Sequence, residues 1–274
     1  MRIHFLGTGA GSATRGRAGT SVLVQSGPHN LLLDCGPRAV DRLVEAGLAD
    51  DDLGAIIITH LHPDHVLGLP AFLQSTIFPA FRPPAIFGPE GTAEFVTRTS
   101  AMLSLTSAPP GRPWGSPLGI GAIEIAGGDE WETAGFTVRS EVVHHVPYLV
   151  AMAHRLSSRG RRIVFSGDTT PVPEIMVPLA DGADILIHEC WSAAGIDRWV
   201  AGADPRRANA IRRAFRETHS EVTAVAQIAA EAGVKRLVLN HLNEGELAHE
   251  LIAEAGQLFA GEIIVAEDRL VIDV

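Results

Sequence analysis

Residues 56–69, IIITHLHPDHVLGL, join an apolar run to a dense group of side chains that can bind metal ions. The isoleucines are typical of a short strand that is buried on both faces of a sheet. Behind them stand His60, His62, Asp64 and His65. Zinc accepts imidazole nitrogen and carboxylate oxygen, usually from four ligands per ion. The pattern therefore predicts a metal site on the loop that follows this strand.

The spacing within this loop would allow two ions. An offset of two residues can turn His60 and His62 toward the same ion, whereas the adjacent pair Asp64 and His65 can face a second one. One loop cannot complete the coordination of two ions. Further ligands must therefore come from other parts of the chain.

Other residues of the ligand type follow apolar, strand-like runs. His144, Asp168 and His241 each stand just past such a run. Ligands at strand ends converge if those ends form one site. His145 is a second candidate beside His144, and adjacent strand residues point to opposite faces. We therefore expect only one of these two histidines at a given metal ion.

The composition bounds the class of protein. The chain has 274 residues, an apolar fraction of 46% and no break in composition, which predicts one compact domain over residues 1–274. The net charge of −10 argues against nucleic-acid binding through a broadly basic surface. No stretch approaches the ~18 continuous apolar residues of a membrane span. Two cysteines, Cys35 and Cys190, are too few for a disulfide framework, so we expect a reduced, cytoplasmic protein.

Strand-like and helical segments are mixed along the whole chain. Strands are expected at 1–6, 20–25, 31–34, 55–58, 85–87, 120–125, 136–143, 148–156, 162–165, 184–187 and 237–239, with two more at the end. Helices are expected at 38–46, from the GPEG turn at 88–91 to about residue 103, at 174–180 and at 246–255. A capping box at 218–221 predicts the start of another helix. Hairpins mixed with helices predict two sheets packed face to face with helices outside.

Two further segments carry less specific signals. Residues 197–217 contain six arginines and are expected to form a solvated helix. Residues 107–119, SAPPGRPWGSPLG, are rich in proline and glycine and are expected to form a surface loop or lid.

The ordered ligand residues resemble those of the metallo-β-lactamase superfamily, whose pattern is H-x-H-x-D-H followed by a distant His, an Asp and a final His. The resemblance extends over nearly the whole chain. It implies a four-layer αββα sandwich of the α+β class, with two metal ions in a cleft at one edge. The ligands that it implies are His60, His62 and His144 for one zinc ion, Asp64, His65 and His241 for the other, and Asp168 as a bridge.

Within this superfamily the chain resembles the ribonuclease Z and arylsulfatase-like branch. The motifs that carry this resemblance are LGTG at 6–9, RAGT at 17–20, LDCG at 33–36, GPEG at 88–91, FSGDT at 165–169 and LIHE at 186–189. The His-x-Val-Pro pattern of the branch selects His144 over His145. His219 stands where the branch has an additional catalytic histidine, which implies a general acid that Glu189 or His188 orients.

Two features depart from the branch. Ribonuclease Z proper grips transfer RNA with an arm between the third histidine and the bridging aspartate, but here His144 and Asp168 are only 24 positions apart. The familiar His-x-Ser-Arg-Tyr ending is replaced by HLNEG at 241–245, so an arginine that holds phosphate is lost. We therefore expect a small substrate, and neither transfer RNA nor a membrane as partner.

Together these residues predict a binuclear-metal hydrolase. A metal-bound hydroxide would attack, Asp64 would position the water or accept its proton, and His219 would protonate the leaving group. The expected substrate is a small phosphodiester or similar anionic ester, such as a cyclic nucleotide; aryl sulfates, lactones and thioesters are alternatives. A metal-stabilised binding or regulatory protein is an alternative of another class. Two zinc ions suit the ligands, with manganese or iron as alternatives, and similar proteins are commonly homodimers.

Overall fold

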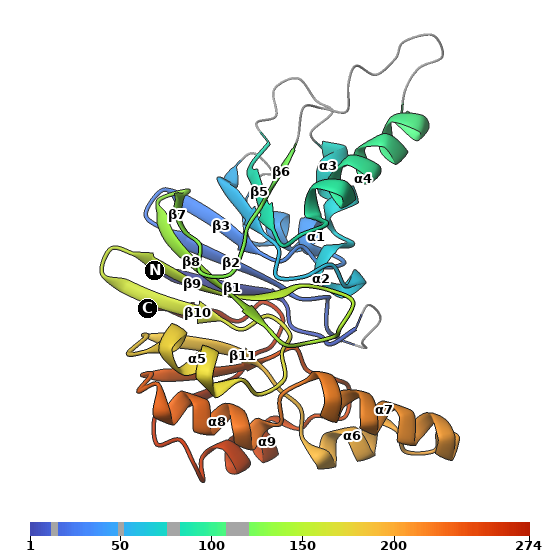
Figure 1. The fold of residues 1–274 in the computed structure, drawn as a ribbon, viewed down its shortest axis with the longest axis vertical. Coiled ribbons are helices and arrows are strands. Elements are labelled where there is room, and N and C mark those ends of the chain that lie inside the picture. The colour runs from blue at the N-terminus through green and yellow to red at the C-terminus, as the bar shows by residue number, and fades with distance from the viewer. Residues whose placement is uncertain (12–15, 49–51, 76–82, 108–120) are drawn as a thin grey trace.

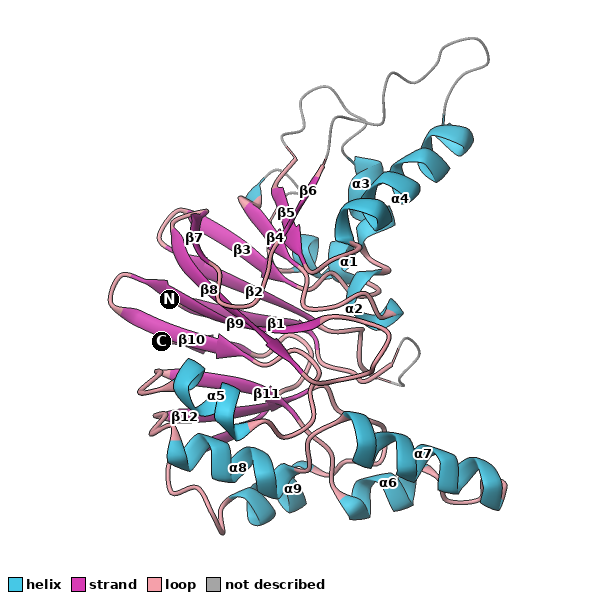
Figure 2. Ribbon diagram, viewed as in Figure 1, coloured by secondary structure: helices cyan, strands magenta, loops and turns pink. Residues whose placement is uncertain are grey.

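The computed structural model describes residues 1–11, 16–48, 52–75, 83–107 and 121–274. These residues form two seven-stranded sheets that pack face to face, and helices cover the outer face of each (Figures 1 and 2). The predicted αββα sandwich of the α+β class is thereby confirmed. The predicted loop or lid at 107–119 lies, from residue 108 on, outside the described residues.

The first sheet is built mainly from the N-terminal half of the chain. Its strand order is β14 (Val271–Asp273), β1 (Arg2–Gly7), β2 (Ser21–Ser26), β3 (His29–Leu33), β4 (Ala55–Ile57), β5 (Ala85–Gly88) and β6 (Ala122–Glu124). The strands from β14 to β3 are antiparallel to their neighbours, and those from β3 to β6 are parallel. The helices of this half are α1 (Ala39–Glu45), α2 (Pro63–Val66), α3 (Leu69–Ser75) and α4 (Thr92–Ser107).

The second sheet belongs to the C-terminal half. Its strand order is β13 (Glu262–Val265), β12 (Arg236–Asn240), β11 (Ile185–Glu189), β10 (Arg161–Phe165), β9 (Ala151–Ser158), β8 (Phe136–Val143) and β7 (Glu130–Thr133). Three helices cover its outer face: α5 (Pro173–Ala180), α8 (Val222–Glu231) and α9 (Ala248–Ala255). Two more, α6 (Ala193–Trp199) and α7 (Pro205–Thr218), pack against each other beside it (Figure 1).

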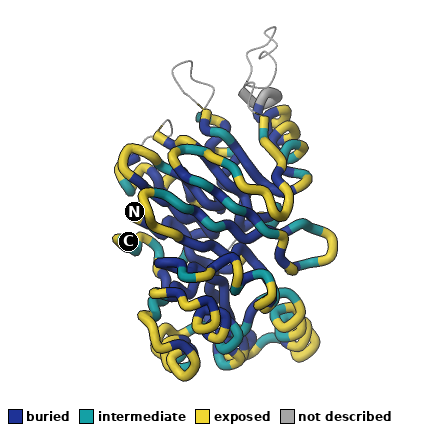
Figure 3. Tube along the Cα trace, turned by 60° about the vertical axis from the view of Figure 1, so that its left-hand side comes forward, coloured by how far each residue is buried: buried dark blue, intermediate teal, exposed yellow. Residues whose placement is uncertain are grey.

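Successive side chains of a strand point to opposite faces of the sheet, so the apolar residues pack partly between the two sheets and partly under the outer helices. Leu31 and Leu33 face the space between the sheets, whereas Leu32 faces the helices on the outer side. In the same way Ile57 points inward, and Ile56 and Ile58 point outward. The strands at the centre of the molecule are consequently buried on both faces (Figure 3). This burial explains why β4 is a continuous apolar run rather than an alternating one.

The strands that precede the chemically important residues end at one edge of the sandwich. In the second sheet β8, β10, β11 and β12 run in the same direction, because β9 is antiparallel to both of its neighbours and β10 to β12 are parallel. The carboxyl ends of parallel strands lie at the same edge of a sheet. The residues that follow these strands are therefore brought together with those that follow β4.

Some local predictions differ from the structure. The segment after β4 was expected to be a loop, but residues 63–66 form the short helix α2, which Pro63 begins. The strand β7 was not predicted. The predicted capping box at 218–221 does not form. Thr218 is the last residue of α7, and its hydroxyl donates to Ala214 O at 2.8 Å. The next helix, α8, begins after Glu221 and has no side-chain cap. Extension of α7 thus overrides the local capping signal.

Among the residues whose structure is described, no helix has both the length and the apolar character needed to cross a lipid bilayer.

Candidate metal centre

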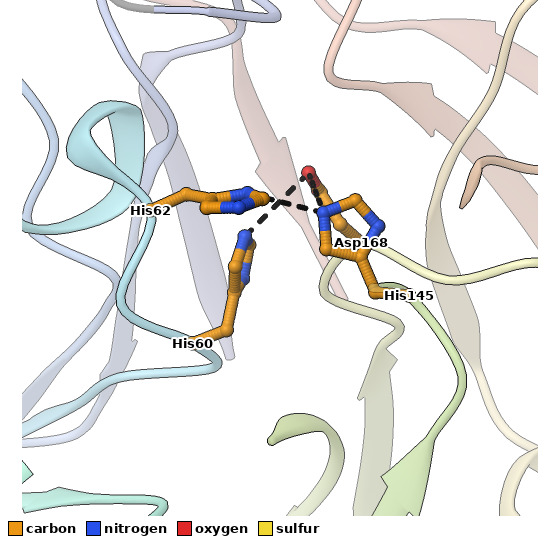
Figure 4. A group of neighbouring side chains, drawn as sticks. All are labelled: His60, His62, His145 and Asp168. Carbon is orange, nitrogen blue, oxygen red and sulfur yellow. Dashed lines mark hydrogen bonds and ion pairs between the residues drawn. The ribbon is translucent and has the colours of Figure 1, made fainter. Parts of the chain in front are cut away.

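Four side chains from three segments meet beside the end of β4 (Figure 4). His60 and His62 lie between β4 and α2, His145 follows β8, and Asp168 follows β10. One ligand atom from each lies within 4.8 Å of the others. Asp168 Oδ2 is 3.7 Å from His60 Nε2 and 3.9 Å from His145 Nε2, which in turn is 3.1 Å from His62 Nδ1. This group can hold one metal ion.

A second group lies directly beside the first. It consists of Asp64, His65 and His241, whose ligand atoms also lie within 4.8 Å of one another. Asp64 Oδ2 is 3.2 Å from His241 Nε2 and 3.7 Å from His65 Nε2. Asp168 reaches this group as well, because its Oδ1 is 3.5 Å from His65 Nε2 and its Oδ2 is 3.3 Å from His241 Nε2. Asp168 therefore lies between the two groups and could contribute an oxygen to each.

The atoms of both groups fit metal ions. His60 Nε2, His65 Nε2 and Asp168 Oδ1 are buried and have no hydrogen-bond partner among the described residues. Such atoms are rare in proteins and require an explanation, for which a bound ion is sufficient. Burial lowers the pKa of His60 well below its usual value and lowers the pKa of His145 to about 4. Both rings are therefore neutral at pH 7, which is the form that binds a metal.

The structure brings His145, and not the predicted His144, into the first group. His145 is 8% exposed and its Nδ1 donates to Thr218 O at 2.7 Å, whereas the His144 side chain is exposed to solvent. Of two adjacent side chains after a strand, one faces the site and the other faces away. The geometry therefore favours His145 over the predicted His144 as a ligand.

Asp34, for which no role was predicted, orients one of the histidines. It directly follows β3, has a left-handed backbone conformation with φ 57°, and is fully buried. Its Oδ2 accepts from His65 Nδ1 at 2.7 Å, and its Oδ1 accepts from the backbone N–H of Thr59 at 2.7 Å. A histidine that donates through Nδ1 presents the lone pair of Nε2 to a metal. The position of Asp34 at a strand end, next to β4, is the signal that could have identified it.

Close backbone packing fixes the segment that carries Asp64 and His65. A Cβ atom on Gly36 would lie 2.2 Å from Asp64 O, so a glycine is required where this segment approaches. Cys35 N donates to His65 O at 2.8 Å, and Gly11 N donates to Asp64 Oδ2 at 2.8 Å. The glycine-rich motifs near the N-terminus thus hold the ligand segment in place.

His219 and Glu189 form a hydrogen-bonded pair beside the metal groups. His219 Nδ1 is 2.9 Å from Glu189 Oε1, which also accepts from Thr169 N at 2.8 Å. Burial disfavours the charged form of His219, but the carboxylates of Glu189, Asp168 and Asp64 together raise the pKa of His219 to about 9. His188 instead directs its Nδ1 to the backbone oxygen of Glu189, at 2.7 Å. Of the two predicted orienting residues, only Glu189 contacts His219.

A cavity of about 340 Å³ opens beside the metal groups and His219. The residues that line it are Ala10, Gly11, His62, Asp64, Asp168, Trp199, Phe215, His219, His241, Asn243 and Glu244. No lysine or arginine is found in this described lining. The arginine-rich segment 197–217 is not the single helix that was expected: it contains the end of α6, a turn at 200–204 and most of α7. The pairs that it makes include Arg212 with Asp197 and Arg213 with Glu217. Trp199 and Phe215 were not predicted to line the site, because only the contact between α6 and α7 brings their rings to the cavity.

Comparisons with known proteins cover most of the chain. The family described as the metallo-beta-lactamase superfamily matches residues 14–218. A protein of Mycobacterium sp. (strain KMS) named Ribonuclease Z is 33% identical over an alignment of 256 residues, and the alignment covers 88% of this chain and 84% of the relative.

Solved structures are similar over the full length. The metallo-beta-lactamase fold protein YhfI from Bacillus subtilis superposes with a TM-score of 0.78 at 22% identity and covers 99% of both chains. The short form of human tRNase Z superposes with a TM-score of 0.72 at 26% identity, over 100% of this chain and 99% of the other. The first likeness, at this low identity, concerns the fold alone.

Proposed function

Because the chain belongs to the metallo-β-lactamase superfamily and is a metal-dependent hydrolase of that fold, we propose that it cleaves a small phosphodiester or a similar anionic ester. The observation that carries this proposal is the hydrogen-bonded pair of His219 and Glu189 beside two adjacent groups of metal ligands. This pair places a proton donor beside the ligand groups, which is typical of a catalytic site.

Two divalent cations would be held by the two groups of ligands, with Asp168 between them. His60, His62 and His145 would hold one, and Asp64, His65 and His241 the other. When bound, such ions polarise an ester oxygen and make a water molecule acidic enough to react near neutral pH. We propose zinc for both positions, with manganese or iron as alternatives that the same donors accept.

His219 would donate a proton to the departing oxygen of the ester. A pKa of about 9 keeps this ring protonated at neutral pH, and the hydrogen bond from Nδ1 to Glu189 leaves Nε2 as the donor. A positioned acid of this kind accelerates a reaction by about 10²-fold to 10⁴-fold. Asp64, held by Gly11 N at 2.8 Å, would orient the reacting water or accept its proton.

The site supports a small substrate better than a polymer. The cavity of about 340 Å³ has the size of a pocket for a small molecule. Between His145 and Asp168 the chain forms only the hairpin of β9 and β10, all of it described, so this segment has no arm to hold an RNA. The net charge of −10 agrees with this reading.

Ribonuclease Z activity is the second candidate, since relatives with that name are 33% identical to this chain. Aryl sulfate, lactone and thioester hydrolysis use the same ligands and are further alternatives.

We also propose that residues 1–274 act as one domain, because the inner core contains residues from strands of both sheets. A cytoplasmic location and a homodimer remain predictions.

The test is a substrate panel on the zinc-loaded protein: bis-p-nitrophenyl phosphate, p-nitrophenyl sulfate, a lactone, a thioester and a precursor transfer RNA. We expect turnover of the phosphodiester and no specific cleavage of the RNA. Strong lactone or thioester turnover without phosphodiester turnover would contradict the proposal, as would specific RNA cleavage with weak activity on the small diester. A protein inactive on the whole panel that binds a metabolite tightly would support a regulatory role instead.

A further inference from the structure

Two aromatic side chains form one wall of the cavity. Trp199 ends α6 and Phe215 lies on α7, and their ring centroids are 5.7 Å apart at an interplanar angle of 83°. Both residues line the cavity, and Trp199 remains 39% exposed. Rings that meet at a right angle form a corner, in which a third ring can face one of them and meet the edge of the other.

This aromatic corner lies on the side of the proposed general acid. The Phe215 ring stacks on His219, with centroids 4.8 Å apart and an interplanar angle of 27°. Because His219 would give its proton to the departing oxygen, a group bonded to that oxygen lies next to the corner. One face of Phe215 is covered by His219, so Trp199 is the ring with surface left for a ligand.

Among the described residues, the charges around the cavity offer no partner for a second anionic group on the substrate. The metal ligands provide for one anionic centre, and no lysine or arginine belongs to the described lining. The nearby Arg212 of α7 donates to Asp197 at 2.7 Å. A large apolar surface in a pocket is stabilised when an apolar ligand covers it. The part of the substrate beyond the reacting ester is therefore expected to be uncharged and apolar.

We propose that Trp199 and Phe215 form a subsite for an aromatic ring attached to the leaving oxygen, so that the substrate is a monoanionic ester of an aryl-type alcohol. Trp199 is the residue that determines this specificity, while Phe215 also positions His219. The inference rests on the proposed function for the place of the leaving group. It adds the chemical class of that group.

The test compares two ligands that differ only in aromaticity, phenylphosphonate and cyclohexylphosphonate. Their binding to the zinc-loaded protein is measured by isothermal titration calorimetry, which requires no turnover. We expect phenylphosphonate to bind about threefold to tenfold more tightly, as a single aromatic contact allows. Trp199→Leu keeps an apolar side chain without a ring and should abolish this preference. The matched variant Trp199→Phe keeps a ring and should retain most of it.

Equal affinity of the two phosphonates for the wild-type protein would overturn the inference, and so would an unchanged preference in Trp199→Leu. Metal content and thermal midpoint of each variant show whether it is folded and loaded. If Trp199→Leu does not fold, the affinities of the wild-type protein for the two phosphonates alone decide whether the inference holds. A protein that prefers phenylphosphonate but hydrolyses none of the panel substrates would refute the proposed function and leave the aromatic subsite in place.

Discussion

His65 Nδ1 lies 2.7 Å from Asp34 Oδ2, and both side chains are completely buried. The carboxylate fixes the ring so that Nε2 faces Asp64 and Asp168. Replacing Asp34 by asparagine keeps the shape but removes the negative charge. We expect the affinity for zinc to fall about 10-fold to 100-fold, which is the usual effect of losing a carboxylate behind a metal-bound histidine. Competition with a chromophoric chelator measures this affinity.

Asp184→Asn provides the control for the loss of a mostly buried carboxylate. Asp184 is 6% exposed and contacts Lys235 and Arg161. This change should leave zinc affinity unaltered. If Asp34→Asn and Asp184→Asn bind zinc equally well, Asp34 does not orient a metal ligand.

The adjacent residues His144 and His145 give a matched pair of variants. His145→Ala removes a buried ring of the first ligand group, so we expect at least about a 100-fold loss of zinc affinity at one site. His144→Ala removes an exposed ring and should bind two zinc ions as the wild-type protein does. Metal content after dialysis, measured by atomic emission, distinguishes the two. A normal metal content in His145→Ala together with a loss in His144→Ala would restore the original prediction.

The layers of the fold could be predicted because they follow from local patterns. Continuous apolar runs such as β4 indicate strands buried on both faces, and the hairpin of β2 and β3 shows its turn in the sequence. Thr218 shows where this reasoning fails. Its side chain fits a helix start as well as a helix end, and only the packing of α7 determines which one forms.

The site was predictable to the extent that its residues share one motif or stand at strand ends. His60, His62, Asp64 and His65 come from one motif, and the structure brings them together with Asp168 and His241. The choice between two adjacent histidines depends on where β8 ends, which sequence patterns fix only to within a residue or two. Trp199 and Phe215 lie on separate helices, and only tertiary packing brings their rings into contact.

His154 gives a prediction on pH and stability away from the metal groups. Its ring is fully buried, and burial lowers its pKa to about 3. The unfolded chain binds a proton at this residue below pH ~6.5, whereas the folded chain stays neutral down to about pH 3. The free energy of unfolding therefore decreases as the pH falls through this range, by up to about 1.4 kcal/mol per pH unit, and is unaffected by this residue above it.

The variant His154→Asn removes this titration. Between pH 7 and pH 5 the wild-type protein should lose about 2 kcal/mol more of its free energy of unfolding than the variant does. Guanidinium denaturation of the chelator-treated protein at both pH values measures this difference, since bound metal would add its own pH dependence. The hydrogen bond between His154 and Ser140, at 2.6 Å, is lost at both values and cancels. An equal pH dependence of the two proteins would show that His154 is protonated in the folded state.

The last prediction concerns His219, which lies close enough to Asp168 and His241 to be a metal ligand as well as an acid. An acid matters most when the leaving group is a poor one. In His219→Ala we expect kcat to fall about 10²-fold to 10⁴-fold for a phenyl phosphodiester and much less for the p-nitrophenyl diester, whose phenolate departs without a proton. Glu189→Gln should show the same dependence with a smaller loss, since it weakens the 2.9 Å contact to His219.

Metal content separates the two roles of His219. If His219 is an acid, His219→Ala still binds two zinc ions, and kcat falls much more for the phenyl diester than for the p-nitrophenyl diester. If it is a ligand, the variant loses zinc, and kcat falls equally for both diesters because the metal acts on each. The hydrogen bond from His219 Nδ1 to Glu189 leaves Nε2 free for either role, just as the bond from His65 Nδ1 to Asp34 leaves Nε2 of His65 free for a metal ion. A general acid keeps the proton on Nε2, whereas a metal ligand must release it, so the metal content of His219→Ala distinguishes the two roles.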